Sequence, residues 1–448
     1  MMKKQQISAI FWLFSAFLLF STSASASILK FPDSEAATVG IMVVDLATGK
    51  ELQSENKEKA MLPASTMKSI TSATALSLRG EDYRFTTDVV ITGTVSSGVL
   101  NGNVVVKACG DPTICSSHFK GVGGFCESII SALKNEGITE IKGKIVVDES
   151  SFKDEGQNPQ WAVGDVGWDY GAGLFGFNYY DNIFRLNTAT KATSPEIPNL
   201  NIQLVRTGKS IDIIRGVDSN NIIVMGSNVG NQGVSVTSTM SDPGAVFVNE
   251  MKKKLASNNI KISNNSVKAT GEKIIYTRKS PTLGEIMRSL MVRSDNMFAE
   301  ATLRTVAPRN SRDEAINTEL RHWSSKGVNI HGVKIYDGSG LARADRVTPQ
   351  FMAGVLSSMA KDAKGSTYLS FFPRVGREGT VKSLLAKTKL EGKLALKSGS
   401  VNGVQCFAGY KLDANGKPSH VVVVMVNNFF CSRDQVRAAI ERWLLETF

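Results

Sequence analysis

Ser65 and Lys68 are the first pair of side chains whose types and spacing could perform chemistry. Apolar residues recur at helical spacing from Met67 until Gly80, so the pair should stand at the start of a helix. Residues three positions apart share one helical face, which would put the hydroxyl beside the amine. A serine hydroxyl needs a nearby base to attack a carbonyl carbon, and this amine could be that base.

Two further motifs could complete such a site. The Ser-Asp-Asn motif at Ser294 to Asn296 lies between two segments of helical periodicity, where a short loop can present side chains. The Lys-Ser-Gly motif at Lys397 to Gly399 ends an apolar run that predicts a strand. Glycine in a strand favours close approach of another backbone, so we expect Gly399 to admit a substrate backbone.

Each motif is a weak signal by itself. The Ser-x-x-Lys pattern also occurs at Ser27, Ser54, Ser117, Ser131, Ser150 and Ser358. The Ser65 copy differs because Pro63 precedes it and an amphipathic helix follows it. The order of the three motifs along the chain is more informative, because this set is typical of penicillin-binding proteins and serine β-lactamases.

From about Ala36 to Arg442 the chain resembles the low-mass class C penicillin-binding proteins, which are D-alanyl-D-alanine carboxypeptidases and endopeptidases. Further family-like stretches are Gly110-Asp111-Pro112-Thr113, Gly167-Trp168-Asp169-Tyr170, Ser294 to Glu300, Tyr336-Asp337-Gly338-Ser339-Gly340-Leu341 and Gly379-Thr380. A long insertion between the first two motifs is also a mark of that family. Ser398 stands where threonine is usual, and Glu378 precedes Gly379 where Asp-Gly-Thr is commoner. The hydroxyl of Ser398 survives, so we expect altered efficiency and no loss of activity.

The resemblance implies a role for each motif residue. Ser65 would attack the carbonyl of the penultimate D-alanine of a peptidoglycan stem peptide and form an acyl-enzyme, with Lys68 as base. Ser294 would relay protons to the leaving amine, and Asn296 would hold Lys68 and the substrate amide. An unperturbed lysine is neutral in about one molecule in 2,500 at pH 7. Burial and the nearby Lys397 should therefore lower the pKa of Lys68.

The remaining implied contacts concern the substrate carboxylate and the reacting carbonyl. Lys397 and Ser398 would receive the terminal carboxylate, and Gly399 would lie against the substrate. The backbone N–H groups of Ser65 and Ser400 would form the oxyanion hole. The resemblance also implies that β-lactam antibiotics acylate Ser65, and it implies no cofactor.

Other functions with the same residues stay open. A β-lactamase or an esterase could use these motifs, and so could a non-catalytic module that binds cell wall or senses β-lactams. A Ser-His-Asp triad is disfavoured because no histidine lies within a nucleophile motif; the histidines are His118, His322, His331 and His420. The sequence does not separate carboxypeptidase from endopeptidase action, and it does not give the third residue of the stem peptide.

The elements that must position these residues lie at both ends of the chain. We expect an α/β (α+β) catalytic domain with an antiparallel sheet and helices, like that of serine β-lactamases and transpeptidases, formed by residues 27–83 and 274–448. A β-rich insertion of one or two subdomains, residues 84–273, would interrupt it. The expected elements of the catalytic domain are strands at Thr38 to Asp45, Glu51 to Gln53, Lys393 to Lys397, Val404 to Tyr410 and His420 to Asn427, and helices at Leu283 to Met291, Met297 to Val306, Asp313 to Gly327 and Arg433 to Leu445.

The N-terminal residues predict export. Lys3 and Lys4 precede an apolar run from Ile7 to Phe20, and the small residues that end at Ala26 match a signal-peptide cleavage site. Residues 1–26 should therefore be a signal peptide, with an uncleaved anchor as the alternative. We expect the mature protein in the periplasm of a bacterium.

The five cysteines suit an exported protein, although an odd count leaves one thiol without an internal partner. Cys406 and Cys431 flank the last strand hairpin, and we expect them to form a disulfide. The group from Cys109 to Cys126, with His118, matches no common zinc spacing, so we expect no metal.

The composition is that of a globular protein of two or three domains, with 448 residues, 42% of them hydrophobic and 21% charged. The net charge of +11 favours anionic partners, which for an exported protein are wall polymers or lipid headgroups and not nucleic acid. A solvated surface explains the charge equally well, because the lysines and arginines are spread along the chain. The sequence does not predict an oligomeric state.

Overall fold

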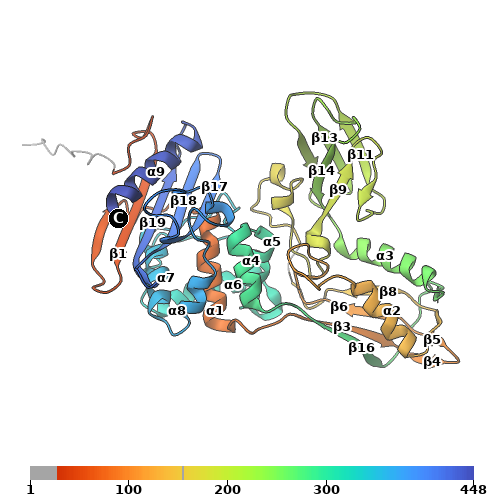
Figure 1. Cartoon of the computed structure of the whole chain (residues 1–448). Helices are drawn as coiled ribbons and strands as arrows, with labels where there is room; N and C mark the ends of the chain where they lie inside the picture. Colours follow the sequence, from red (N-terminus) through yellow and green to blue (C-terminus); the bar gives the residue numbers. More distant parts are fainter. Residues whose placement is uncertain (1–27, 154–155) are drawn as a thin grey trace, which may run out of the picture.

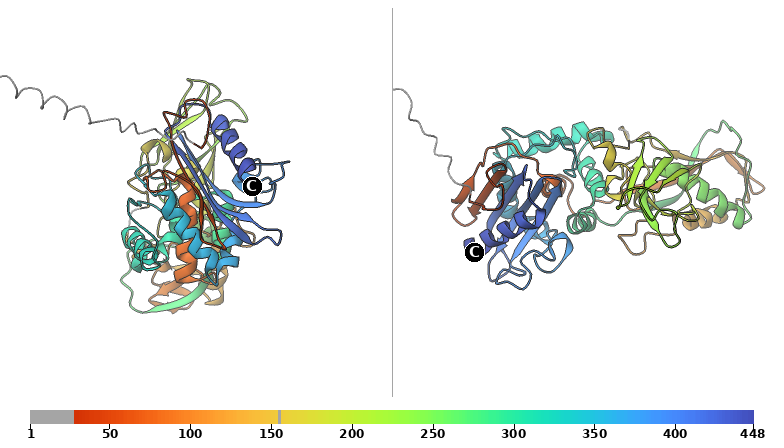
Figure 2. Two further views of the ribbon diagram at one scale, coloured as in Figure 1. Left: turned by 90° about the vertical axis from the view of Figure 1, so that its left-hand side faces the viewer. Right: turned by 90° about the horizontal axis from the view of Figure 1, so that it is seen from above.

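The computed structural model describes residues 28–153 and 156–448. The expected signal peptide, residues 1–26, lies outside the described residues. The molecule is elongated, with a sheet built from both ends of the chain on one side and the long insertion on the other (Figures 1 and 2). No helix within the described ranges has the length and hydropathy needed to cross a membrane.

Both ends of the chain contribute to one antiparallel sheet. Its strands are β1 (Thr38–Asp45), β2 (Glu51–Glu55), β17 (Leu394–Val401), β18 (Val404–Leu412) and β19 (Pro418–Asn427). Their order is β17-β18-β19-β1-β2, so β1 pairs with β19 and β17 lies at an edge. The expected N-terminal hairpin and the three C-terminal strands are confirmed.

Helices cover both faces of this sheet (Figure 1). Those in contact with it are α1 (Met67–Arg79) and α7 (Pro349–Lys361) on one face and α9 (Arg433–Thr447) on the other. Four more helices pack against α1 and α7: α4 (Leu283–Arg293), α5 (Asn296–Arg304), α6 (Arg312–Ser325) and α8 (Gly365–Ser370). The run Val421 to Val426 has no polar residue because its side chains alternate between two buried cores, one shared with α1 and α7 and the other with α9. The expected α/β (α+β) catalytic fold is confirmed; α7 and α8 were not expected.

The insertion contains four small sheets around one further core. Its strands are β3 (Thr86–Thr92), β4 (Thr94–Ser96), β5 (Val99–Asn101), β6 (Val104–Lys107), β7 (Glu140–Ile141), β8 (Ile145–Asp148), β9 (Ile183–Asn187), β10 (Thr193–Ser194), β11 (Asn201–Val205), β12 (Asp212–Arg215), β13 (Asn221–Met225), β14 (Ser235–Thr239), β15 (Lys261–Ile262) and β16 (Glu272–Lys279). The sheet orders are β16-β3-β6-β8, β15-β7-β5-β4, β10-β9-β14 and β11-β13-β12. The domain boundaries at 84 and 273 stay a prediction; β16 starts before residue 273 and continues its pairing with β3 as far as Lys279.

Two helices of the insertion were not expected from the sequence: α2 (Phe125–Asn135) and α3 (Pro243–Ser257). Asp242 caps α3, because its side chain accepts a hydrogen bond from the Ala245 nitrogen, and Pro243 occupies the first turn. This helix-start pattern lies among Val- and Ile-rich strands, and the strand pattern of the region hid the helix in the sequence analysis. Short 3₁₀ turns complete the fold: η1 (Ala64–Thr66), η2 (Val163–Asp165), η3 (Asp169–Gly171), η4 (Tyr180–Asn182), η5 (Pro308–Asn310) and η6 (Gly379–Val381).

The expected disulfide between Cys406 and Cys431 is wrong. All five cysteines lie in the described residues, and all are free thiols. Cys406 belongs to the core on the α1 side of the sheet, and its Sγ lies 3.6 Å from the Leu62 carbonyl oxygen. Cys431 packs against the core on the α9 side. Side chains on opposite faces of a sheet cannot be bridged without moving the backbone.

Candidate active site

Ser65 lies in η1, the tight turn that leads directly into α1. Ala64 before it has φ of 45°, a left-handed conformation that is uncommon for residues other than glycine. Two glycines pack so closely against this turn that no side chain would fit there. A Cβ on Gly340 would lie 1.9 Å from the Ala64 oxygen, and one on Gly399 would lie 2.8 Å from the Ser65 nitrogen. The close approach that Gly399 permits in the structure is therefore to the Ser65 turn itself.

Lys68 lies one helical turn beyond Ser65 and is wholly buried. Its Nζ donates to three oxygens: Ser65 Oγ at 2.9 Å, Asn296 Oδ1 at 2.6 Å and the Ser339 carbonyl at 2.7 Å. Burial lowers the pKa of Lys68 from 10.5 to about 8, against the opposing effect of nearby carboxylates, of which Asp337 is the strongest. Burial is the cause expected from the sequence. The expected effect of Lys397 on the pKa of Lys68 is not found, because the repulsion between the two lysines lowers the pKa of Lys397 instead.

Lys397 on β17 is also wholly buried. Its Nζ donates to Ser294 Oγ at 2.9 Å and to the Ser398 carbonyl at 2.7 Å. Burial, and then the positive charge of Lys68, hold the pKa of Lys397 well below its ordinary value. The two lysines therefore stand close together, and Lys397 reaches the cleft through the hydroxyl of Ser294.

The Ser294 to Asn296 motif forms the joint between α4 and α5. Ser294 has φ of 65° and ends α4, and Asp295 caps α5 by accepting a hydrogen bond from the Phe298 nitrogen at 2.8 Å. The Asn296 side chain accepts from Lys68 and donates to the Tyr170 carbonyl of the insertion at 2.7 Å. The insertion thus contacts the same amide that holds Lys68.

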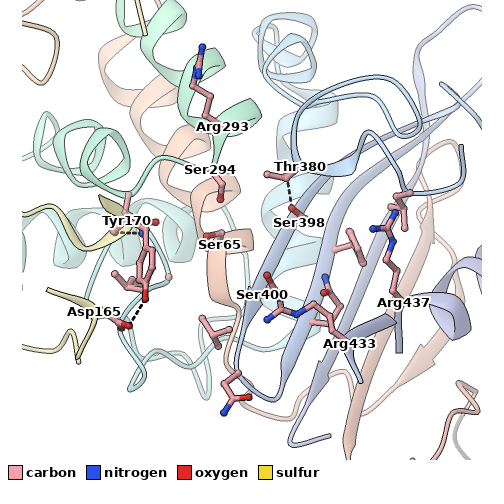
Figure 3. A pocket seen from close by; sticks show the side chains of 18 of the residues that line it. Ser65, Asp165, Tyr170, Arg293, Ser294, Thr380, Ser398, Ser400, Arg433 and Arg437 are labelled. Atoms are coloured by element: carbon pink, nitrogen blue, oxygen red, sulfur yellow. Dashed lines mark hydrogen bonds between the residues drawn. The ribbon is translucent and has the colours of Figure 1, made fainter. Parts of the chain in front are cut away.

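These groups surround one cavity of about 690 Å³. Ser65, Ser294, Asn296, Ser398 and Ser400 line it, and Figure 3 shows the labelled serines around this space. Lys68 and Lys397 are buried behind them. The structure therefore gathers the eight residues expected at the site around one cleft, with Gly399 packed against its nucleophile turn.

Several side chains of the cavity were not assigned from the sequence. Thr380 Oγ1 lies 2.6 Å from Ser398 Oγ, so two hydroxyls stand together at the β17 edge (Figure 3). Gly379-Thr380 was noted in the sequence as a family-like stretch, and this pattern could have identified Thr380 as a site residue. Charged and aromatic side chains also line the cavity. Asp165 and Tyr170 come from the insertion and Arg293 from the end of α4. Arg343 comes from the loop after Leu341, and Arg433, Asp434 and Arg437 come from α9.

The loop behind Lys68 is organised by Asp337. Its carboxylate accepts hydrogen bonds from the backbone nitrogens of Ser339, Gly340, Leu341 and Ala342. Trp161 Nε1 of the insertion donates to the same carboxylate at 2.8 Å. Asp337 therefore holds the loop behind Lys68, and the buried Trp161 joins the insertion to that loop. Among the described residues no cluster of three His, Cys, Asp or Glu side chains could hold a metal ion.

The fold and the serine–lysine cleft define a penicillin-binding type of serine acyl-transfer enzyme. The model of the D-Ala-D-Ala carboxypeptidase 3 (S13) family matches residues 22–446, and the chain belongs to this family. It is accordingly a serine-type D-alanyl-D-alanine peptidase, and the resemblance seen in the sequence is confirmed.

Individual relatives agree with this assignment. A D-alanyl-D-alanine carboxypeptidase of Actinomadura sp. (strain R39) is 24% identical over 438 residues, which cover 90% of this chain and 80% of that protein. The carboxypeptidase DacB of Haemophilus influenzae is 24% identical over 412 residues, 86% of this chain and 84% of that protein.

Solved structures share the fold. Penicillin-binding protein 4 (dacB) of Haemophilus influenzae aligns with a TM-score of 0.79 at 22% identity, over 93% of this chain and 97% of that one. The penicillin G acylated predatory endopeptidase Bd3459 of Bdellovibrio bacteriovorus aligns with a TM-score of 0.51 at 18% identity, over 92% of each chain.

Proposed function

We propose that the chain cleaves the bond after the penultimate D-alanine of peptidoglycan stem peptides through an acyl-enzyme on Ser65. The observation that carries this proposal is the 2.9 Å contact between Ser65 Oγ and the buried Nζ of Lys68. With a pKa of about 8, Lys68 is neutral in about one molecule in ten at pH 7, about 250 times more often than an ordinary lysine. Burial therefore lowers the free energy of forming the base by about 3 kcal/mol.

The proton path follows from the contacts. Neutral Lys68 accepts the Ser65 proton as Oγ bonds to the carbonyl carbon. The carbon–nitrogen bond then breaks, and the Ser294 hydroxyl delivers a proton to the leaving amine. Lys397 serves this step by donating to Ser294 Oγ, which orients the hydroxyl and can replace the proton it gives up. Water next hydrolyses the ester: its oxygen bonds to the acyl carbon, its proton restores the Ser65 hydroxyl, and Lys68 gives up its proton to solvent. Asn296 holds Lys68 in reach of Ser65 through its 2.6 Å hydrogen bond.

The substrate carboxylate would bind at the β17 edge. Ser398 and Thr380 present paired hydroxyls to the cavity, whereas the Nζ of Lys397 lies behind them and donates to Ser294 Oγ and the Ser398 carbonyl. The backbone N–H groups of Ser65 and Ser400 would hold the oxyanion, each contributing about 3 kcal/mol to transition-state stabilisation. Gly399 sets the distance between these two donors, because it packs against the Ser65 turn.

We further propose that β-lactams acylate Ser65 and that the protein is exported to the periplasm. Solved relatives support the first point: one is complexed with a β-lactam and another is acylated by penicillin G. The signal-peptide pattern of residues 1–26 supports the second.

Endopeptidase action is the second candidate. Structural neighbours from Bdellovibrio bacteriovorus are named as endopeptidases, and the cavity extends from Ser65 past Ser398 to the start of α9. That length of cleft suits a leaving group larger than one D-alanine. Both activities share the acyl-enzyme and differ only in the leaving group on the far side of the scissile bond.

The test is incubation with purified uncross-linked pentapeptides and cross-linked muropeptides, with products identified by mass. We expect D-alanine release from the first and conversion of dimers to monomers from the second. Ser65→Ala should abolish both, and Ser358→Ala, at a Ser-x-x-Lys copy in α7, should abolish neither. Product formation by Ser65→Ala would overturn the assignment.

A further inference from the structure

A histidine of the insertion contacts the central residue of the Ser294 to Asn296 motif. His118 follows β6 in the loop that leads to α2, far from the catalytic motifs in sequence. Its Nε2 lies 3.4 Å from Asp295 Oδ2 and 3.9 Å from Asp181 Oδ1. The three side chains are 17%, 19% and 6% exposed in the order His118, Asp295, Asp181, so solvent screens this cluster little.

Aromatic packing fixes the same contact. The His118 ring meets the Phe298 ring edge-on at a centroid distance of 5.3 Å, and Phe119 stacks on Phe298 at 5.9 Å. Phe298 lies in the first turn of α5 and is itself the residue whose nitrogen Asp295 caps. The insertion loop is therefore docked on the first turn of α5 at the point where the motif begins.

The two carboxylate oxygens of Asp295 make different contacts. Oδ1 caps α5, and Oδ2 faces His118. Its neighbour Ser294 is held at φ of 65°, a conformation that a serine keeps only when its surroundings impose it. Ser294 contacts Lys397 and Asn296 contacts Lys68, so a shift of Asp295 would move both contacts.

We propose that His118 is a positioning residue for the reaction: by holding Asp295 it keeps Ser294 and Asn296 against the two buried lysines. This inference rests on the proposed function for its effect on catalysis. It also makes the insertion part of the catalytic apparatus.

The charge state of His118 tunes this contact. Burial lowers the pKa of His118, but the Asp295 and Asp181 carboxylates outweigh burial and the opposing charge of Arg293, and the net pKa is raised above 6.5. Nδ1 is buried with no hydrogen-bond partner among the described residues, whereas Nε2 faces the carboxylates. The attraction to Asp295 is therefore strongest in acid and is lost as the pH rises through the raised pKa.

The test compares wild type, His118→Ala, His118→Gln and Asp295→Asn by their rates of acylation with a fluorescent penicillin between pH 5 and 9. His118→Ala should lower the acylation rate about tenfold with little change in penicillin binding. A small displacement of catalytic groups slows the chemical step, whereas the contacts that bind penicillin are kept. His118→Gln keeps a donor near Asp295 without charge and should restore most of the rate. The wild-type rate divided by the His118→Gln rate should fall as the pH rises through a midpoint above 6.5. Both proteins contain Lys68, so the effect of its titration on the rate is removed from this ratio.

A second readout does not depend on activity. Hydrogen exchange of backbone amides 293–299 at pH 6 should be faster in His118→Gln and Asp295→Asn than in wild type. His331→Ala, at an exposed histidine, is the matched control and should match wild type in both assays. Unchanged exchange together with unchanged acylation in His118→Ala and His118→Gln would overturn the proposal. A wild type that penicillin fails to acylate would instead overturn the proposed function, and the exchange data would still decide whether His118 holds the loop.

Discussion

The rate of Ser65 acylation should follow the deprotonation of Lys68. Because burial lowers the pKa of Lys68 to about 8, the neutral base makes up about 1% of molecules at pH 6, about 10% at pH 7 and about 90% at pH 9. The acylation rate should therefore rise about tenfold from pH 6 to pH 7 and less than about twofold from pH 8 to pH 9. An ordinary lysine would instead give a tenfold rise per unit up to about pH 10.

The assay is stopped-flow acylation with a chromogenic or fluorescent β-lactam, fitted for the second-order rate constant at each pH. Lys68→Arg keeps a cation next to Ser65 but cannot act as a base at these pH values, and it should lose about 10²–10⁴-fold in rate. It should also lose the rising limb of the profile. A wild-type rate that is flat from pH 6 to pH 8, or a rising limb retained by Lys68→Arg, would refute Lys68 as the base.

Three further changes test the surrounding structure. Gly399→Ala would place a methyl group 2.8 Å from the Ser65 nitrogen; acylation should fall at least about tenfold, and a wild-type rate would show that this contact does not shape the site. Arg278→Leu would leave the buried carboxylate of Asp111 without its ion-pair partner and should lower the free energy of unfolding in urea by about 3–5 kcal/mol; a loss below about 1 kcal/mol would contradict this. Burial raises the pKa of Glu319 to about 7, so the native state binds this proton more tightly than the unfolded chain and loses stability as the pH rises from 4.5 to 7. Glu319→Gln should remove that loss, seen as a larger gain in melting temperature at pH 8 than at pH 5; equal changes at both would argue against it.

The sequence predicted those parts of the structure that depend on local pattern. The strand at Thr38 to Asp45 has the expected bounds, and the helix after Ser65 ends at Arg79, directly before Gly80, as its periodicity indicated. The grouping of the three motifs was also predicted correctly, because their order was specific even though each motif was weak.

The rest depends on contacts between distant segments, which no local pattern encodes. The neighbour of Gly399 is the Ser65 turn, and a strand pattern can indicate close packing at a glycine without naming the partner. The contact of His118 with Asp295 joins an irregular loop to a helix cap, with no periodicity on either side. The disulfide expectation failed because closeness to a hairpin in sequence does not reveal on which side of the sheet a side chain packs: Cys406 packs on the α1 side, and Cys431, in the loop after β19, packs on the α9 side.

The distinction between roles at the two lysines also required coordinates. Both residues were expected at the site, but Lys397 is buried behind Ser294, whose hydroxyl lines the cavity in its place. The sequence therefore indicated which residues lie together around the cleft, but not the contacts among them.

Peptide mapping of the penicillin-treated protein by mass spectrometry tests the central claim most directly. If Ser65 is the nucleophile activated by Lys68, one penicilloyl group should form per molecule, on the peptide that contains Ser65, and Ser65→Ala should carry none. An unmodified wild type, or an adduct that persists in Ser65→Ala, would contradict the account.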